Sequence, residues 1–251
     1  MSSFEWWQLL LLTGAGFISG FLNILAGGGS LLTLPMLIFI GLPPIEANGT
    51  NRIGVAVQNI IGVRSFSKSG VLSWRLAIMC SLPAIVGACI GAYLAVDIDP
   101  AMFRQILAAV MILMVIVTAI DPVKRYGAKL TAPNPKANWL MLLGFFFIGI
   151  YGGFIQAGIG FLILIVTTLA GLDLVRGNVL KVVVILIFTI PAVVIFAWHG
   201  QVNWYIGVLL ACGNAAGAAV AAPMAVKKGH AWIRRVVTLA IILCALKLFL
   251  W

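Results

Sequence analysis

The chain has 251 residues, of which 63% are hydrophobic and only 9% are charged, whereas a typical soluble domain carries about 25% charged residues. A soluble protein of this composition would leave much apolar surface in water, so the composition favours an integral membrane protein. The net charge of +10 does not indicate nucleic-acid binding, because the basic residues gather in short gaps between apolar runs and form no continuous basic face. We therefore expect the lipid bilayer as a partner and no nucleic acid.

The apolar residues form ten segments in two groups of five. The first group occupies residues 8–26, 30–40, 45–63, 74–96 and 101–120. The second group occupies residues 139–156, 160–170, 174–198, 204–226 and 232–250. Most segments approach the ~20 residues that a helix needs to cross ~30 Å of hydrocarbon, whereas two of them, 30–40 and 160–170, are half-length helices. The sequence therefore predicts an all-α polytopic membrane protein.

The two groups are related by an internal repeat at an offset of 130 residues. Coinciding pairs include Gly28 with Gly158, Asn48 with Asn178, Gly70 with Gly200, Trp74 with Trp204, and Arg104 with Arg234. These residue types carry more weight than apolar pairs, which coincide easily in so apolar a chain. We therefore predict a first transmembrane repeat over residues 1–120 and a second over 139–251. Between them, residues 121–138 form a linker with three prolines and four basic residues.

The loops predict that the two repeats insert in opposite directions, because cytoplasmic loops are enriched in Lys and Arg. The loop at 64–75 carries three basic residues, whereas its counterpart at 199–203 carries no Lys or Arg. The next loop shows the reverse: two aspartates lie at 97–99, and four basic residues lie in the corresponding 227–235. The basic linker is expected in the cytoplasm and both termini outside.

Two versions of this topology fit the loops equally well. Each half has either five crossings or three full crossings plus a re-entrant hairpin formed by its first two segments. Both are inverted-topology repeats of about five helical segments, with short broken or re-entrant half-helices. This architecture is typical of secondary transporters, whose substrate lies near the membrane midplane where the repeats meet.

Glycine-rich breaks at corresponding positions of the two halves point to the substrate site. The residues at these breaks are Gly28, Gly29, Ser30, Gln156, Gly158 and Gly160. Glycine lets the backbone break without a Cβ clash, and a half-helix that begins there presents free N–H groups to an anion. The alternative is close helix packing, as expected for Gly87 and Gly91, which are spaced by four residues.

Each half also brings one cation to the start of its third segment. These cations are Arg52, which follows Asn51, and Lys181, which coincides with Asn51 at the 130-residue offset. A cation at the centre of a membrane helix costs at least ~2.5 kcal/mol, so it is a functional candidate by default. The alternative is that both side chains extend to the headgroups. Further polar candidates beside them are Asn23, Asn48 and Asn178.

The acidic residues are informative because all six lie at segment ends or in loops. Since no carboxylate lies in the middle of a segment to hold a cation, the expected substrate is a small anion. The membrane potential contributes about 2.3 kcal/mol per charge per 100 mV toward expelling an anion, so export would need no coupling ion. With the inverted repeats, we expect export by alternating access. An anion channel and an importer of small carboxylates or sulfonates are the alternatives.

An enzyme is not expected, because the two histidines lie in loops and no pair of acids lies within the segments. The four cysteines, Cys80, Cys89, Cys212 and Cys244, all lie in apolar segments without metal-ligand spacing. They are expected to be small packing residues, and no cofactor or metal is expected.

These motifs resemble the sulfite exporter TauE/SafE family of bacterial membrane permeases. The resemblance covers nearly the whole chain and rests on Gly16-Phe-Ile-Ser-Gly20, on residues 26–30 followed by Leu34-Pro35, and on residues 41–52. It implies transport of sulfite, sulfoacetate or related organosulfur anions, or of other small carboxylates, across the bacterial cytoplasmic (inner) membrane. In the second half, Ile159 and Gly160 depart from the three-glycine pattern of residues 27–29.

Overall fold

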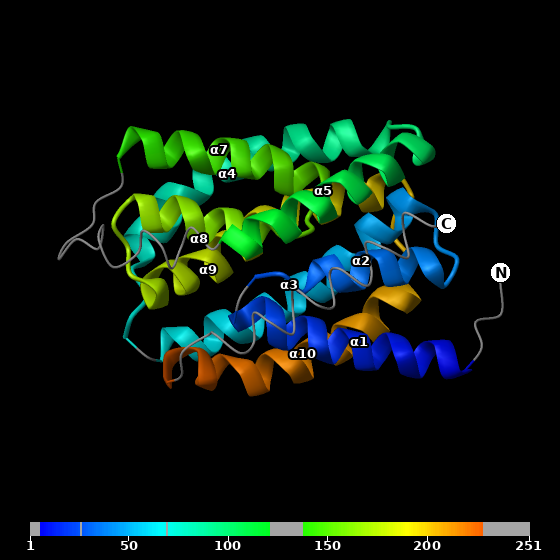
Figure 1. Ribbon diagram of the computed structural model, residues 1–251, viewed down its shortest axis with the longest axis horizontal. Helices are drawn as coiled ribbons and strands as arrows, with labels where there is room; N and C mark the ends of the chain where they lie inside the picture. Colours follow the sequence, from blue (N-terminus) through cyan, green and yellow to red (C-terminus); the bar gives the residue numbers. More distant parts are fainter. Residues whose placement is uncertain (1–5, 26, 69, 121–137, 228–251) are drawn as a thin grey trace.

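The structure, a computed structural model, describes residues 6–25, 27–68, 70–120 and 138–227 (Figure 1). The segment predicted at 232–250 and nearly all of the linker lie outside these residues, as does Ala26. Over the described residues the protein has nine α-helices and no strand. The prediction of an all-α polytopic membrane protein is therefore confirmed.

The helices of both halves begin and end close to the predicted segments. The first half contains α1 (Trp6–Leu25), α2 (Ser30–Phe39), α3 (Pro44–Ser67), α4 (Trp74–Val96) and α5 (Pro100–Ile120). The second half contains α7 (Trp139–Phe154), α8 (Ile159–Leu169), α9 (Leu174–Trp198) and α10 (Trp204–Lys227). The largest difference is at the end of α3, which continues past the apolar run through a polar turn to Ser67.

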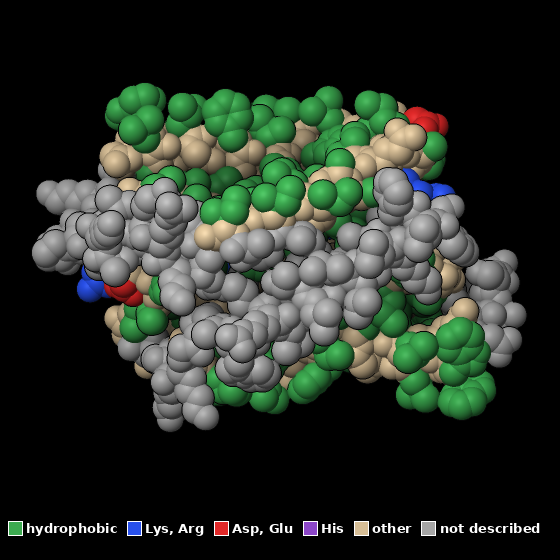
Figure 2. Space-filling model, in the orientation of Figure 1, with side chains coloured by type: hydrophobic (Ala, Val, Ile, Leu, Met, Phe, Trp, Pro, Cys, Tyr) green, Lys and Arg blue, Asp and Glu red, His purple; other side chains and the backbone are tan. Residues whose placement is uncertain are grey.

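Four helices, α1, α4, α9 and α10, are long and apolar enough to cross a membrane. Large apolar side chains also face outward along the bundle; Leu82, Val86 and Leu94 of α4, for example, are each more than half exposed. Where described residues are visible in Figure 2, such side chains cover the long sides and charged side chains lie at the two ends. This distribution suits a multi-pass membrane protein, whose sides face lipid and whose ends face water.

The short helices α2 and α8 end in the same way, because a glycine follows each of them at the position where a left-handed residue closes the helix. Gly41 and Gly171 have φ angles of +104° and +86°. After α2 the Gly41 N–H donates to Ile38 and the Leu42 N–H to Leu37, and the equivalent pair of hydrogen bonds follows α8. These paired bonds satisfy the last carbonyl groups of each helix and turn the chain sharply into α3 and α9.

The two halves run in opposite directions along the bundle (Figure 1). In this view α1 and α3 run from right to left, whereas α7 and α9 run from left to right. Each half begins with a helix that ends inside the bundle, followed by a short helix that turns back toward the end where that half begins. This course suits the version with a re-entrant hairpin, which stays a prediction.

The halves are interlocked, because the first helix of each packs on the fourth helix of the other. A Cβ atom added at Gly20 of α1 would overlap the backbone of Asn214 in α10. A Cβ added at Gly87 of α4 would likewise overlap the carbonyl oxygen of Phe146 in α7. Glycine at these positions lets the backbones touch, which is how helices commonly associate within a bilayer. The close packing predicted for Gly87 and Gly91 is therefore confirmed.

Candidate functional site

The two helix breaks meet at the centre of the bundle. The first break lies between α1 and α2, and the second between α7 and α8. A Cβ atom added at Gly27 would overlap the Cα atom of Gly160, and a Cβ at Gly160 would overlap Gly27. Gly27 and Gly158 also have positive φ angles, of +89° and +71°, which side chains rarely tolerate. Glycine is therefore required at the breaks both for backbone conformation and for direct contact between the halves.

Arg52 of α3 is completely buried and lies against the end of α7. Its Nη1 donates to the carbonyl oxygen of Gly152 at 2.9 Å, and its Nη2 donates to that of Gly153 at 2.5 Å. The guanidinium also lies 4.5 Å from the centre of the Phe196 ring, within the range of a cation–π interaction. Arg52 thus belongs to the first half but binds the broken helix of the second.

Lys181 of α9 makes the reciprocal contact and is only 1% exposed. Its Nζ donates to the carbonyl oxygens of Asn23 and Ile24 at the end of α1, at 2.7 and 3.4 Å. It also donates to the side-chain oxygen of Asn178, at 2.6 Å. The cation of the second half thus binds the broken helix of the first.

Two asparagines complete this reciprocal arrangement. Asn48 Nδ2 donates to the carbonyl oxygen of Phe154 at 2.8 Å, and Asn178 Nδ2 donates to that of Ile24 at 2.9 Å. Both the donors and the acceptors of these two hydrogen bonds are related by the 130-residue offset of the sequence repeat. The repeat therefore extends from the sequence to individual hydrogen bonds.

The role of these contacts follows from the polarity of helices. The last carbonyl groups of a helix lack partners within it and form the negative end of its dipole. Deep in a membrane no water is available, and each unsatisfied backbone group costs several kcal/mol. Arg52 and Lys181 therefore cap the C-terminal ends of α7 and α1. Neither side chain extends to the surface, so the alternative that they reach the headgroups does not apply.

Asn23 acts at the opposite side of the first break, where α2 begins. Its Oδ1 accepts a hydrogen bond from the backbone N–H of Gly29 at 2.9 Å, and its Nδ2 lies 3.4 Å from Ser30 Oγ. One of the free N–H groups predicted to face an anion is therefore occupied by this side chain. Gly28 accepts the N–H of Leu31 and helps to form the first turn of α2.

Several buried polar atoms near the breaks have no hydrogen-bond partner within the described residues. They include two donors, Asn51 Nδ2 and Arg52 Nε, and two acceptors, Asn48 Oδ1 and Gln156 Oε1. Buried polar groups are normally paired, and leaving one unpaired costs about 1–3 kcal/mol. Such atoms are places where a ligand or water would gain hydrogen bonds.

Two threonines that the sequence did not single out hold these polar side chains in place. Thr33 of α2 donates to Asn51 Oδ1 at 2.6 Å, which orients the free Nδ2 of Asn51. Thr189 of α9 accepts from Gln156 Nε2 at 2.6 Å, which orients the free Oε1 of Gln156. The only signal in the sequence is a threonine within an apolar run, and such residues often bond simply to their own helix.

The electrostatics of the interior are one-sided. Among the described residues, Arg52 and Lys181 are the only buried charged side chains, and no Asp or Glu is buried with them. Carbonyl dipoles at the helix ends offset these two positive charges only in part, since a helix end is equivalent to roughly half a charge. Over the described residues, the buried side-chain charge at the centre of the protein is therefore positive.

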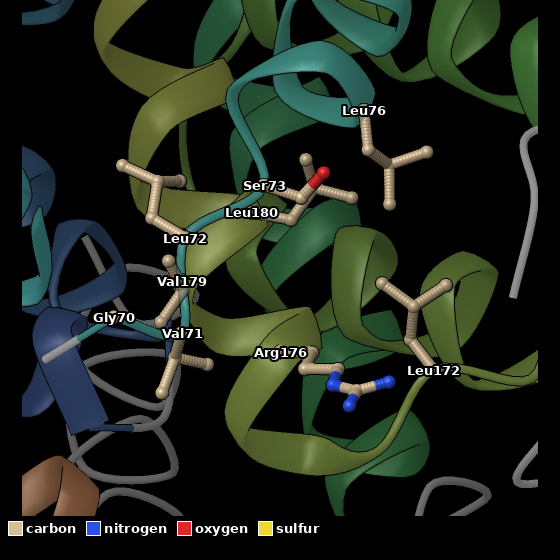
Figure 3. Close-up of a pocket in the computed structure, with 9 residues that line it drawn as sticks. All are labelled: Gly70, Val71, Leu72, Ser73, Leu76, Leu172, Arg176, Val179 and Leu180. Atoms are coloured by element: carbon tan, nitrogen blue, oxygen red, sulfur yellow. The ribbon is translucent and has the colours of Figure 1, made fainter. Parts of the chain in front are cut away.

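A pocket of about 450 Å³ lies apart from this centre, at the end of the bundle where α5 ends and α7 begins, hereafter the linker end (Figure 3). It lies between the turn before α4 and the start of α9. None of the predicted site residues lines it. Its lining residues are Gly70, Val71, Leu72, Ser73, Leu76, Leu172, Arg176, Val179 and Leu180.

The fold and the site define a helical membrane protein in which two broken helices meet between interlocked halves, as in secondary transporters. Comparison with known proteins agrees, since the sequence pattern of the sulfite exporter TauE/SafE family matches residues 12–248. The chain belongs to this family. It is a membrane transporter rather than an enzyme.

Curated relatives share the same general description. A protein of a Sinorhizobium species named "Probable membrane transporter protein ORF9" is 27% identical over 241 residues, which cover 96% of this chain and 92% of that protein. A "Probable membrane transporter protein" of Haemophilus influenzae is 28% identical, covering 92% and 90%. The "Probable membrane transporter protein YfcA" of Escherichia coli is 25% identical, covering 92% and 86%.

Proposed function

We propose that this transporter exports a small sulfur-containing anion, such as sulfite or sulfoacetate, and that the anion binds where the two helix breaks meet. One observation carries the proposal: two cations and several unpartnered polar atoms are buried at this contact, with no buried carboxylate among the described residues. The family description adds sulfite as the first ligand to test.

The donors that remain free suit an oxyanion. Arg52 uses Nη1 and Nη2 to cap α7 but keeps Nε free, and Asn51 keeps Nδ2 free. Hydrogen bonds from charged donors to an anion are about twice as strong as neutral ones. We infer that the cations have two tasks, holding the broken helices together and supplying a positive field for the substrate.

The proposed direction follows from the membrane potential, and the proposed mechanism from the arrangement of the two halves. A negative interior potential drives an anion outward by about 2.3 kcal/mol per charge per 100 mV, so export needs no coupling ion. Oppositely directed halves and a central site support alternating access. Direct backbone contact between Gly27 and Gly160 favours a carrier over a channel, which needs a continuous path.

The topology proposed with this function places the linker in the cytoplasm and both termini outside a bacterial inner membrane. The basic loops support the assignment. The opposite directions of α3 and α9 in Figure 1 support an inverted pair, for which we propose the bounds 1–120 and 139–251.

Binding of sulfite to the purified protein tests the proposal directly. We expect sodium sulfite and sodium sulfoacetate to raise the Tm in a saturable manner, because a ligand that binds only the folded state stabilises it. Sodium chloride at equal ionic strength should not raise it. Asn51→Asp should remove the effect, because it puts a negative charge beside the free donors.

Asn214→Asp is the matched control, since Asn214 is also a buried asparagine but bonds Gln58 between α3 and α10. It should keep the sulfite-dependent rise in Tm even if its own Tm is lower. A response to sulfite that survives Asn51→Asp would place the anion elsewhere, and saturable counterflow in vesicles would distinguish a carrier from a channel.

A further inference from the structure

At each end of the bundle, the turn before the fourth helix of one half faces the start of the third helix of the other half. At the end opposite the linker, hereafter the distal end, the turn before α10 lies on the start of α3. The backbone N–H of Asn203 donates to Thr50 Oγ1 at 2.9 Å, and its Nδ2 donates to Glu46 Oε1 at 3.3 Å. Gln201 lies so close that a Cβ atom on Gly49 would overlap its carbonyl oxygen. These two surfaces are in full contact.

At the linker end a pocket lies between parts of the equivalent surfaces. The 130-residue offset relates the five distal contact residues to Val71, Ser73, Arg176, Val179 and Leu180. All five line the pocket of about 450 Å³. In Figure 3 Ser73 and Arg176 lie on opposite sides of this space, whereas Val71 is drawn beside Val179. The pair Asn203 and Glu46 is thus in contact at the distal end, while the equivalent pair Ser73 and Arg176 faces a pocket at the linker end.

We propose that these surfaces are the two gates of the transporter, and that the pocket is the substrate entrance of a conformation open at the linker end. The inference rests on the proposed transport function, because two gates that never open together are what alternating access requires. Transport would then close the linker gate by bringing Ser73 and Arg176 together across the pocket. It would open the distal gate by breaking the two hydrogen bonds that Asn203 donates to Thr50 and Glu46.

The charges of the two entrances differ in a way that suits an anion entering at the linker end. Arg176 is the only charged side chain among the nine described lining residues, whereas its counterpart at the distal gate is Glu46. Arg176 is paired with Asp173 at 3.3 Å, but both side chains remain well exposed, so this surface pair is weak and open to exchange. A positive entrance raises the local concentration and association rate of anions, and a negative one lowers them.

Two matched disulfide pairs test the assignment, in a background where Cys80, Cys89, Cys212 and Cys244 are replaced by serine. The distal pair is Glu46→Cys with Asn203→Cys, and the linker pair is Ser73→Cys with Arg176→Cys. A disulfide needs Cα atoms within about 7 Å. Without substrate, we therefore expect mild oxidation to close the distal pair at least roughly tenfold faster than the linker pair, whose positions are separated by the pocket.

Anion flux in vesicles supplies the second measurement. Each disulfide should stop flux, and reduction should restore it to the level of the same variant before oxidation. Equal rates for the two pairs would overturn the open and closed assignment. Unchanged flux with either disulfide formed would overturn the gates. If the reduced variants and the unsubstituted protein carry no anion at all, the proposed function fails, while the two disulfide rates still report which end is open.

Discussion

Single side chains at the centre of this protein connect its two halves. Arg52 and Lys181 were predicted from the sequence as candidate ligands for an anion, and that role stays a prediction. What the sequence could not provide is their partners, because these are backbone carbonyl groups of a helix 100 or more residues away. A carbonyl group has no signature in the residue type, so a capped helix end is visible only in the folded chain.

Substitution of either cation should therefore affect folding and transport together. Arg52→Met leaves the carbonyl groups of Gly152 and Gly153 unpaired, and hydrogen bonds to a charged group contribute about 1.5–3 kcal/mol each. We expect a lower Tm and a loss of sulfite flux of roughly tenfold or more. Lys181→Met should behave alike at the end of α1.

The exposed basic residues Arg64 and Lys68 give the matched controls. Arg64→Met and Lys68→Met each remove one positive charge from the polar end of α3, away from the helix breaks. Both variants should keep the Tm. If Arg52→Met kept the wild-type Tm as well, the capping role of Arg52 would be wrong.

At the scale of helices, the sequence predicted nearly every boundary within the described residues, because length and hydropathy determine what can cross a bilayer. The half-length segments were also predicted, from their length and from the glycines that precede them. The direction of the short helices was not. A half-length apolar segment looks the same whether it continues across the membrane or turns back, and the turn depends on Gly41 and Gly171 acting as helix ends.

Contact between α1 and α10 gives a prediction with an internal control on one helix. A methyl group added at Gly20 would overlap the backbone of Asn214, whereas nothing lies within 4 Å of one added at Gly14. Gly20→Ala should force the helices apart and lower the Tm by several degrees. Gly14→Ala should leave the Tm unchanged or raise it, since alanine favours a helix by about 0.8–1 kcal/mol over glycine. Thermal unfolding of the two variants in the same detergent decides the matter, and equal effects would contradict the close contact.

For the whole molecule, loop charges predicted that the halves insert in opposite directions, and the opposite course of α3 and α9 in Figure 1 is what such an insertion requires. The interlocking of the halves was not predictable. Glycines spaced by four indicate that a helix packs closely, but they do not name the partner helix. Nor could the state of the two proposed gates be predicted, because the same sequence would form both their open and their closed states.

Labelling in intact cells tests the topology. Ser67→Cys and His199→Cys place a thiol at exposed positions at opposite ends of the bundle. A membrane-impermeant maleimide should label His199→Cys from outside and should label Ser67→Cys only after the cells are opened. Labelling of both positions from the same side would exclude the inverted arrangement.

The exchange of caps between the halves has a consequence for biosynthesis. Arg52 is made 100 residues before the carbonyl group of Gly152 that receives it, which at ~5–20 residues per second leaves the arginine without its final partner for ~5–20 s. During this interval Arg52 in the newly inserted first half has no helix end to bind, and the C-terminal end of α1 is not yet capped by Lys181. We therefore expect the nascent protein to become stable only when its second half has entered the bilayer. A chain whose synthesis stops before that point should be degraded by membrane proteases.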